Sequence, residues 1–159
     1  METNQNKLVV AFVLSLVLFI ACDSKREYDG FTAIPESGWN KDSVAVFKVP
    51  VHSIVQPYDL FLQLRNHEGY TYSNCWLFVD VVTPSGKARR DTVECFLADP
   101  TGKWLGSGFG SLYTTTTTWQ QGVKFNEHGE YQFRISQGMR VDNLTGIVDV
   151  GLRIEKRGE

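Results

Sequence analysis

Three cysteines are the residues of this chain whose type and position could support covalent chemistry. Cys22 directly follows fourteen uncharged residues, Leu8 to Ala21, and a polar segment that carries Lys7 precedes them. This profile is typical of a signal peptide. As a helix the apolar stretch would span roughly 21 Å, which is shorter than the roughly 30 Å hydrocarbon core of a bilayer. A small residue followed at once by Cys resembles a bacterial lipobox, so we predict cleavage after Ala21 and acylation of the Cys22 thiol.

Acylation at Cys22 would make a membrane the first predicted partner of the chain. Each buried CH₂ of an acyl chain such as palmitate contributes about 0.8 kcal/mol, so two or three chains anchor a protein stably. We therefore expect a signal peptide at residues 1–21, a lipidated N-terminus and flexible tether at 22–38, and one domain at 39–159. Two alternatives stay open, namely an ordinary secretory signal with an incidental Cys, and an N-terminal strand around Phe31 to Ile34.

The other two cysteines, Cys75 and Cys95, flank the turn at Pro84 to Lys87 almost symmetrically. Alternation places both on the core side of two strands that could form a hairpin. Export to an oxidising envelope would permit a disulfide between them. Two buried free thiols that pack as small apolar groups are an equal alternative.

Catalytic and metal-binding patterns are not found in the sequence. His52, His67 and His128 lie far apart, and none has the spacing of a zinc site. The glycine-rich stretch Gly102 to Gly110 lacks the phosphate-binding pattern, and the glycines beside Ser107 do not match a nucleophile elbow. The sequence therefore predicts a non-enzyme without metal or cofactor, and no small-molecule ligand is expected.

Aromatic residues offer the only candidate interaction surface. Tyr70, Tyr72, Asn74 and Trp76 alternate and would share one face of a strand, with Trp104 as a further candidate. Aromatic rings beside an amide could stack on a sugar or bind a protein partner. The same residues could instead form the second side of a fully buried central strand.

The elements that must position these residues are predicted to be strands. Apolar residues recur with period two, or in short runs bounded by Gly, Pro, Asn and Asp, and helical spacing is nowhere sustained. The expected strands are 43–49, 58–65, 70–82, 89–98, 104–113, 114–125, 130–136 and 147–156. This pattern favours a single all-β domain, an antiparallel β-sandwich of jelly-roll type. A closed eight-stranded barrel with a ligand cavity, as in a lipocalin-like carrier, is the structural alternative.

Composition is consistent with one folded domain that does not bind nucleic acid. The 159 residues are 42% hydrophobic and 13% aromatic, which is enough for one core. Sixteen basic and eighteen acidic side chains give a net charge of -2, so the chain lacks the positive charge that phosphate binding requires.

Several short motifs together resemble the GldH family of gliding-motility lipoproteins of the Bacteroidetes. Their order and spacing cover nearly the whole chain. They are the lipobox Cys22, Trp39-Asn-Lys-Asp42, Tyr58-Asp-Leu, Arg65-Asn66, Tyr70-x-Tyr72-x-Asn74, Gly102-Lys-Trp-Leu-Gly106-x-Gly108, Tyr131-x-Phe133-x-Ile135, Met139-Arg140 and Leu144-x-Gly146-Ile-x-Asp149-Val-Gly151.

The resemblance implies an envelope lipoprotein, in the outer membrane, that is a non-catalytic structural or assembly component of the gliding machinery. It also implies protein partners among the gliding and type IX secretion components. The alternative function is a carbohydrate-binding module that uses Tyr70, Tyr72, Trp76, Trp104 or Trp119 as a stacking platform.

Overall fold

The computed structural model describes residues 25–158, and the predicted signal peptide and Cys22 lie outside them. Ten strands form in this part of the chain. They are β1 (Arg26–Ala33), β2 (Trp39–Asn40), β3 (Ala45–Val51), β4 (Tyr58–His67), β5 (Asn74–Val82), β6 (Ala88–Phe96), β7 (Leu112–Val123), β8 (Gly129–Gln137), β9 (Asn143–Leu144) and β10 (Ile147–Lys156).

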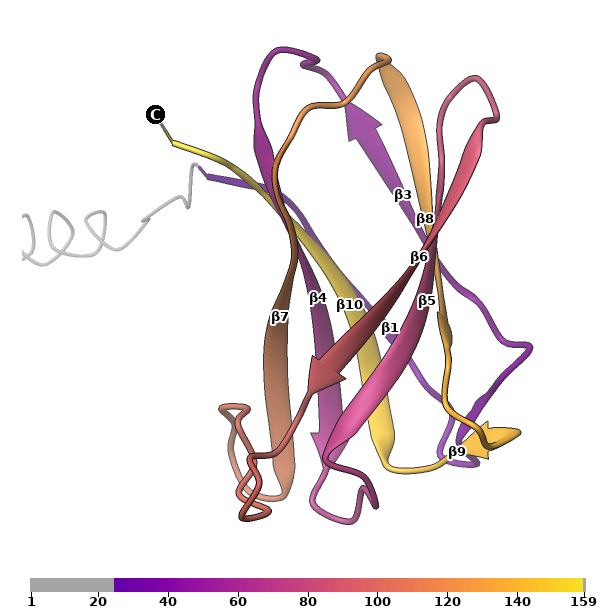
Figure 1. Cartoon of the computed structure of the whole chain (residues 1–159), viewed down its shortest axis with the longest axis vertical. Coiled ribbons are helices and arrows are strands. Elements are labelled where there is room, and N and C mark those ends of the chain that lie inside the picture. The colour runs from indigo at the N-terminus through magenta and orange to yellow at the C-terminus, as the bar shows by residue number, and fades with distance from the viewer. Residues whose placement is uncertain (1–24, 159) are drawn as a thin grey trace, which may run out of the picture.

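Eight of these strands form two four-stranded antiparallel sheets that face each other (Figure 1). One sheet has the order β1-β10-β4-β7 and the other has the order β3-β8-β5-β6. This alternation of the chain between two sheets is the jelly-roll arrangement. The predicted sandwich is confirmed, and because each sheet has two edge strands, the described strands do not close into the alternative barrel.

Period-two alternation explains how each sheet forms one wall of the core. In β3, Ala45, Phe47, Val49 and Val51 are buried while the residues between them are exposed. The same alternation buries one face of β4, β5, β8 and β10. The fully buried side chains that fill the space between the sheets include Tyr58, Leu60, Leu62, Leu64, Leu77, Phe133, Ile135, Leu152 and Ile154.

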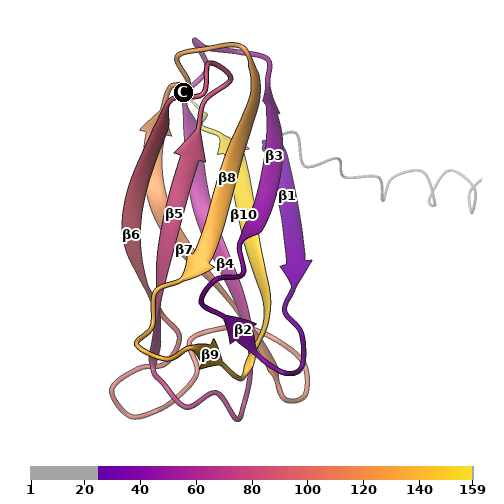
Figure 2. The same cartoon turned by 90° about the vertical axis from the view of Figure 1, so that its right-hand side faces the viewer.

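One end of the sandwich is closed by the short strands β2 and β9, which pair Trp39 with Leu144 and Asn40 with Asn143 (Figure 2). Trp39 is 1% exposed, and its indole Nε1 donates to the Ser43 carbonyl oxygen at 3.0 Å. Within residues 25–158 no helix has the length and hydrophobicity needed to cross a bilayer.

The first strand corrects the predicted tether, because residues 26–33 form the edge strand β1 instead of a flexible segment. Its core side packs through Tyr28, whose ring lies edge-on to Phe47 at 6.4 Å. Its outer side is charged, and Asp29 faces Arg153 at 3.6 Å. Because charged and apolar residues are mixed in β1, its period-two alternation is not evident in the sequence.

The predicted strand at 104–113 is also wrong, since this segment is mostly a loop held by two isolated bridges, Ala98 to Trp104 and Ser107 to Thr114. Its glycines allow close backbone packing. A Cβ atom at Gly108 would collide with the carbonyl oxygen of Leu112, so the loop can lie against the start of β7 only because no side chain is present there.

Candidate functional site

A surface hollow of about 530 Å³ lies where β5 begins and β8 ends. We call it the β5 hollow. One wall comes from the start of β5 and the residues before it, and the other wall is the loop that follows β8. Its lining residues are Tyr72, Asn74, Trp76, Gly138, Met139, Arg140 and Val141.

Hydrogen bonds from backbone amides connect the two walls of the β5 hollow and fix its width. The Gly138 amide donates to the Trp76 carbonyl oxygen at 2.6 Å, and the Trp76 amide approaches the Met139 sulfur at 3.3 Å. A Cβ atom at Gly138 would lie 3.2 Å from the ring of Phe78. The small residue at position 138 therefore lets the loop turn closely over β5.

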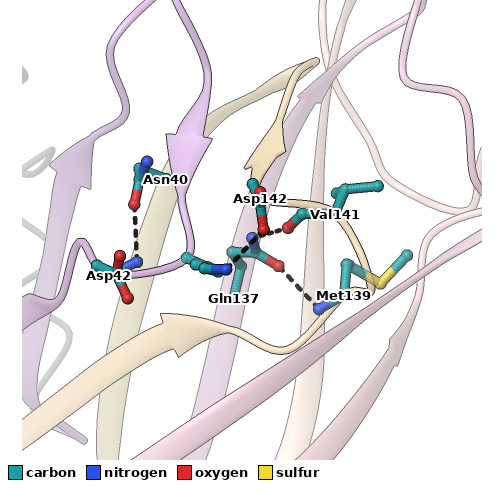
Figure 3. Close-up of polar contacts among 7 residues, drawn as sticks. Asn40, Asp42, Gln137, Met139, Val141 and Asp142 are labelled. Atoms are coloured by element: carbon teal, nitrogen blue, oxygen red, sulfur yellow. Dashed lines mark hydrogen bonds and ion pairs between the residues drawn. The ribbon is translucent and has the colours of Figure 1, made fainter.

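The side chain of Gln137 forms hydrogen bonds with the loop that makes one wall of the hollow (Figure 3). Its side chain is 2% exposed, its Oε1 accepts from the Met139 amide at 2.8 Å, and its Nε2 donates to the Val141 carbonyl oxygen at 2.8 Å. Both hydrogen-bonding groups of the buried amide are used within one loop. One buried side chain thus sets the conformation of residues 138–141.

The segment around β2 supports the same loop from its far side (Figure 3). The Lys41 amide donates to the Asp142 carbonyl oxygen at 2.9 Å, and the Lys41 ammonium donates to the Asp142 carboxylate at 2.6 Å. This hydrogen bond and the charge of Lys41 lower the pKa of Asp142. Asn40 Oδ1 accepts from the Asp42 amide at 2.9 Å, which shapes the turn after β2.

The five residues predicted as one interaction surface do not all lie on one surface in the structure. Tyr72 and Trp76 are 39% and 38% exposed and line the β5 hollow beside Asn74. Tyr70 is buried, since β5 begins at Asn74 and not at residue 70, and its hydroxyl donates to the Asn74 carbonyl oxygen at 2.9 Å. Trp104 lies in the loop before β7, packs on the ring of Tyr113 in β7 and does not line the hollow.

Asn74 is positioned by a cross-strand contact, because its Nδ2 donates to Glu94 Oε1 at 2.5 Å. Its side chain is thereby oriented at the floor of the hollow, next to two exposed aromatic rings. Arg140 places an exposed guanidinium group at the rim. The β5 hollow can therefore accept an apolar or aromatic group and offer polar contacts around it, which is the arrangement of a binding surface.

The sequence prediction missed the loop wall of the hollow. Gln137, Gly138 and Val141 carry no motif of their own, and the pair Met139-Arg140 appeared only as part of the family resemblance. The motifs around Trp39, Tyr72 and Met139 are far apart in the chain, yet they meet at one end of the sandwich.

Cys75 and Cys95 lie directly opposite each other in the pairing of β5 with β6, and both thiols are free in the structure. Burial raises the pKa of Cys75 to about 12 and that of Cys95 to about 11. At neutral pH the two groups are therefore protonated and act as apolar core residues. A disulfide across this pair in the envelope stays a prediction.

No group of three or more His, Cys, Asp or Glu side chains among the described residues could hold a metal ion. The fold and the hollow together define a jelly-roll β-sandwich domain with a surface hollow lined by aromatic residues at one end. The chain belongs to the GldH lipoprotein family, whose model matches residues 26–154.

Two curated relatives match nearly the whole chain. A gliding motility lipoprotein GldH homolog of Christiangramia forsetii is 40% identical over 155 residues, which covers 93% of this chain and 94% of the relative. The gliding motility lipoprotein GldH of Flavobacterium johnsoniae is 37% identical over 152 residues, which covers 91% and 94%.

Similarity to solved structures is low. An arabinose-bound α-L-arabinofuranosidase matches with a TM-score of 0.39 and 9% identity, over 79% of this chain and 18% of that chain. A match at this level says nothing about function.

Proposed function

We propose that this protein is an envelope-anchored lipoprotein that acts as a non-catalytic structural or assembly component of the gliding-motility machinery associated with type IX secretion. The observation that carries the proposal is the family membership over residues 26–154, together with relatives named gliding motility lipoproteins. The predicted acyl anchor at Cys22 would hold the domain at a membrane, most simply the outer membrane.

The β5 hollow is the proposed contact with a protein partner. Its exposed Trp76 and Tyr72 and its partly buried Met139 are of the residue types that are enriched at protein interfaces, since they combine large apolar area with adaptable packing. The polar rim, which includes Arg140 and Asn74, would fix the orientation of the partner. The hydrogen bonds of Gln137 keep the hollow formed before binding, which lowers the entropy cost of association.

Membrane anchoring would contribute to assembly by raising the effective concentration of the domain near other membrane-bound components. This contribution needs no strong intrinsic affinity in the hollow. A domain that lacks the acyl anchor should then fold normally and yet fail in assembly.

The test is complementation of a gliding host, Flavobacterium johnsoniae, that lacks its own relative. The unchanged chain should restore colony spreading, and the protein should sediment with membranes. Cys22→Ala should leave the protein folded but move it out of the membrane fraction, with loss of spreading. Membrane fractionation of Cys22→Ala identical to that of the unchanged chain would refute the anchor.

A carbohydrate-binding role is the second candidate, and the observation that favours it is the exposure of Tyr72 and Trp76 next to Asn74. Exposed aromatic rings with a neighbouring amide suit a sugar ring as well as a protein side chain. A glycan array probed with the purified protein separates the two functions. Saccharide binding that is lost in Trp76→Ala would favour the carbohydrate role, and absence of binding would favour assembly.

A further inference from the structure

The edge strand β7 differs from the other three sheet edges in its composition. Its twelve residues include no charged residue and no proline. The other edges carry such residues at several positions, and these discourage pairing with another chain: Arg26, Glu27 and Asp29 in β1, Lys48 and Pro50 in β3, and Arg89, Arg90, Asp91 and Glu94 in β6. β7, at the outer edge of its sheet in Figure 1, has no such protection.

The hydrogen-bond pattern shows which backbone groups of β7 point outward. Thr114 exchanges two backbone hydrogen bonds with Ser107, at 2.8 and 3.1 Å, on the side away from β4. Backbone groups in an antiparallel strand alternate between its two sides. Those of Thr115 and Thr117 therefore point toward β4, and those of Thr116 and Thr118 point toward the open edge.

No further strand pairs with this open edge among the described residues. The contact of Ser107 with Thr114 is an isolated bridge that does not extend to Thr116. The backbone N–H and carbonyl of Thr116 therefore point to the open edge. Farther along β7, the side chains of Trp119 and Gln120 donate to the Asp91 carboxylate of β6 in the facing sheet, from Nε1 at 3.2 Å and from Nε2 at 2.8 Å. The open edge is therefore a short segment centred on Thr116 to Thr118.

An uncharged hollow of about 460 Å³ adjoins this segment. Phe96 and Leu105, which are 58% and 56% exposed, form its apolar walls. None of its lining residues is charged; they are Phe96, Leu105, Ser107, Thr114, Thr115, Thr116 and Thr117. An uncharged lining matches an uncharged ligand, because an ionised side chain placed there would lose hydration without gaining a partner.

We propose that the open edge of β7 binds an extended, uncharged peptide segment of a partner protein by strand addition. The backbone of the segment pairs with the outward groups of Thr116 and Thr118 and continues the row that Ser107 begins. One apolar side chain of the segment enters the hollow between Phe96 and Leu105. Main-chain pairing supplies the affinity, and the hollow supplies the selectivity, as in other strand-addition complexes.

Because the backbone groups of β7 alternate between its two sides, a substitution can block the open edge and spare the pairing with β4. Thr116→Pro removes an N–H that points to the open edge and leaves the ladder with β4 intact, so the domain should remain folded. Leu105→Lys places a charge in the hollow at an exposed position and disturbs no buried contact. Val55→Ala, at a position that is 76% exposed and lies outside both hollows, is the control.

The probe is a library of random nine-residue peptides displayed on phage, selected on the full mature lipoprotein in nanodiscs after removal of phage that bind empty nanodiscs. We expect enriched peptides that are uncharged and alternate apolar or β-branched residues. Their Kd should rise about three- to tenfold in Thr116→Pro, which removes one hydrogen bond and adds steric hindrance, and comparably in Leu105→Lys. Val55→Ala should bind them like the unchanged protein.

Two results would overturn the proposal. One is the enrichment of no peptide, or of peptides whose Kd is the same for the unchanged protein, Thr116→Pro and Leu105→Lys. The other is light scattering that shows a dimer for the unchanged protein and a monomer for Thr116→Pro, because the occupant of the edge would then be a second copy of the chain.

Discussion

Replacing Gln137 by Met should open the loop wall of the β5 hollow while the rest of the sandwich persists. Methionine has nearly the same length and fills the same buried space, but it can neither accept from the Met139 amide nor donate to the Val141 carbonyl oxygen. The variant therefore isolates the two hydrogen bonds from side-chain volume.

The expected loss of stability follows from the Met139 amide and the Val141 carbonyl, which would lose their hydrogen-bond partner. A buried donor or acceptor that loses its partner costs about 1–3 kcal/mol, so two such groups would cost about 2–6 kcal/mol if both stayed dry. Met139 and Val141 are only partly buried, and water can reach the loop once it moves. We therefore expect the lower end, a loss of about 2 kcal/mol in the free energy of unfolding.

The assay is equilibrium urea unfolding combined with amide hydrogen exchange. The Met139 amide should exchange much faster in Gln137→Met, while amides in β4 and β10 keep the protection set by global unfolding. Gln132→Met on the outward side of the same strand is the control, and it should change stability by no more than about 0.5 kcal/mol. Unchanged exchange at Met139, with an unchanged urea midpoint, would refute the role of Gln137.

Three further predictions concern the core. Thr115 is buried, and its hydroxyl has no hydrogen-bond partner among the described residues, so Thr115→Val should raise the free energy of unfolding by about 1 kcal/mol in urea titrations; a decrease would contradict this. Burial raises the pKa of Cys75 to about 12 and of Cys95 to about 11, from 9.0, so the folded state binds these protons more tightly. Their stabilising contribution is complete below pH 9.0 and is lost as the pH rises toward 12; urea midpoints should fall over this range, and less steeply in a Cys75→Val, Cys95→Val double variant. Gly146 has φ +89°, and a Cβ there would lie 2.8 Å from Tyr70 Cα, so Gly146→Ala should cost about 2 kcal/mol or more in thermal unfolding; an unchanged Tm would argue against that close contact.

The long strands of the sandwich were predictable because their alternation is regular. The predicted strand at 147–156 matches β10, and the prediction at 58–65 falls within β4. The pairing of Cys75 with Cys95 also followed from the turn between them. In these strands most buried residues are apolar, with Gln63 and Asn66 of β4 as the polar exceptions, so local pattern and tertiary burial largely agree.

The predictions failed where tertiary contacts override the local pattern. β1 carries charges whose partners lie on β10, and only the folded sheet reveals that they belong to a strand. In the predicted strand at 104–113, residue types with high strand propensity lie beside glycines that serve close backbone packing.

The candidate site was predicted in part. Tyr72, Asn74 and Trp76 line the β5 hollow, and Tyr70 leaves their face because the strand begins four residues later than expected. The opposite wall could not be inferred, because Gln137 has its role only through contacts with a loop that the sequence does not mark.

We propose that the β5 hollow is the surface through which this envelope-anchored protein acts in the gliding machinery. The most direct measurement is the gliding speed of Flavobacterium johnsoniae cells that lack their own relative and carry either Trp76→Ala or Phe109→Ala. Phe109 is 97% exposed and lies outside the hollow, which makes it the matched control. We expect normal protein level and membrane location for both variants, with gliding lost only in Trp76→Ala. Gliding of Trp76→Ala cells at the speed of cells with the unchanged chain would show that the β5 hollow is not the surface that acts in gliding.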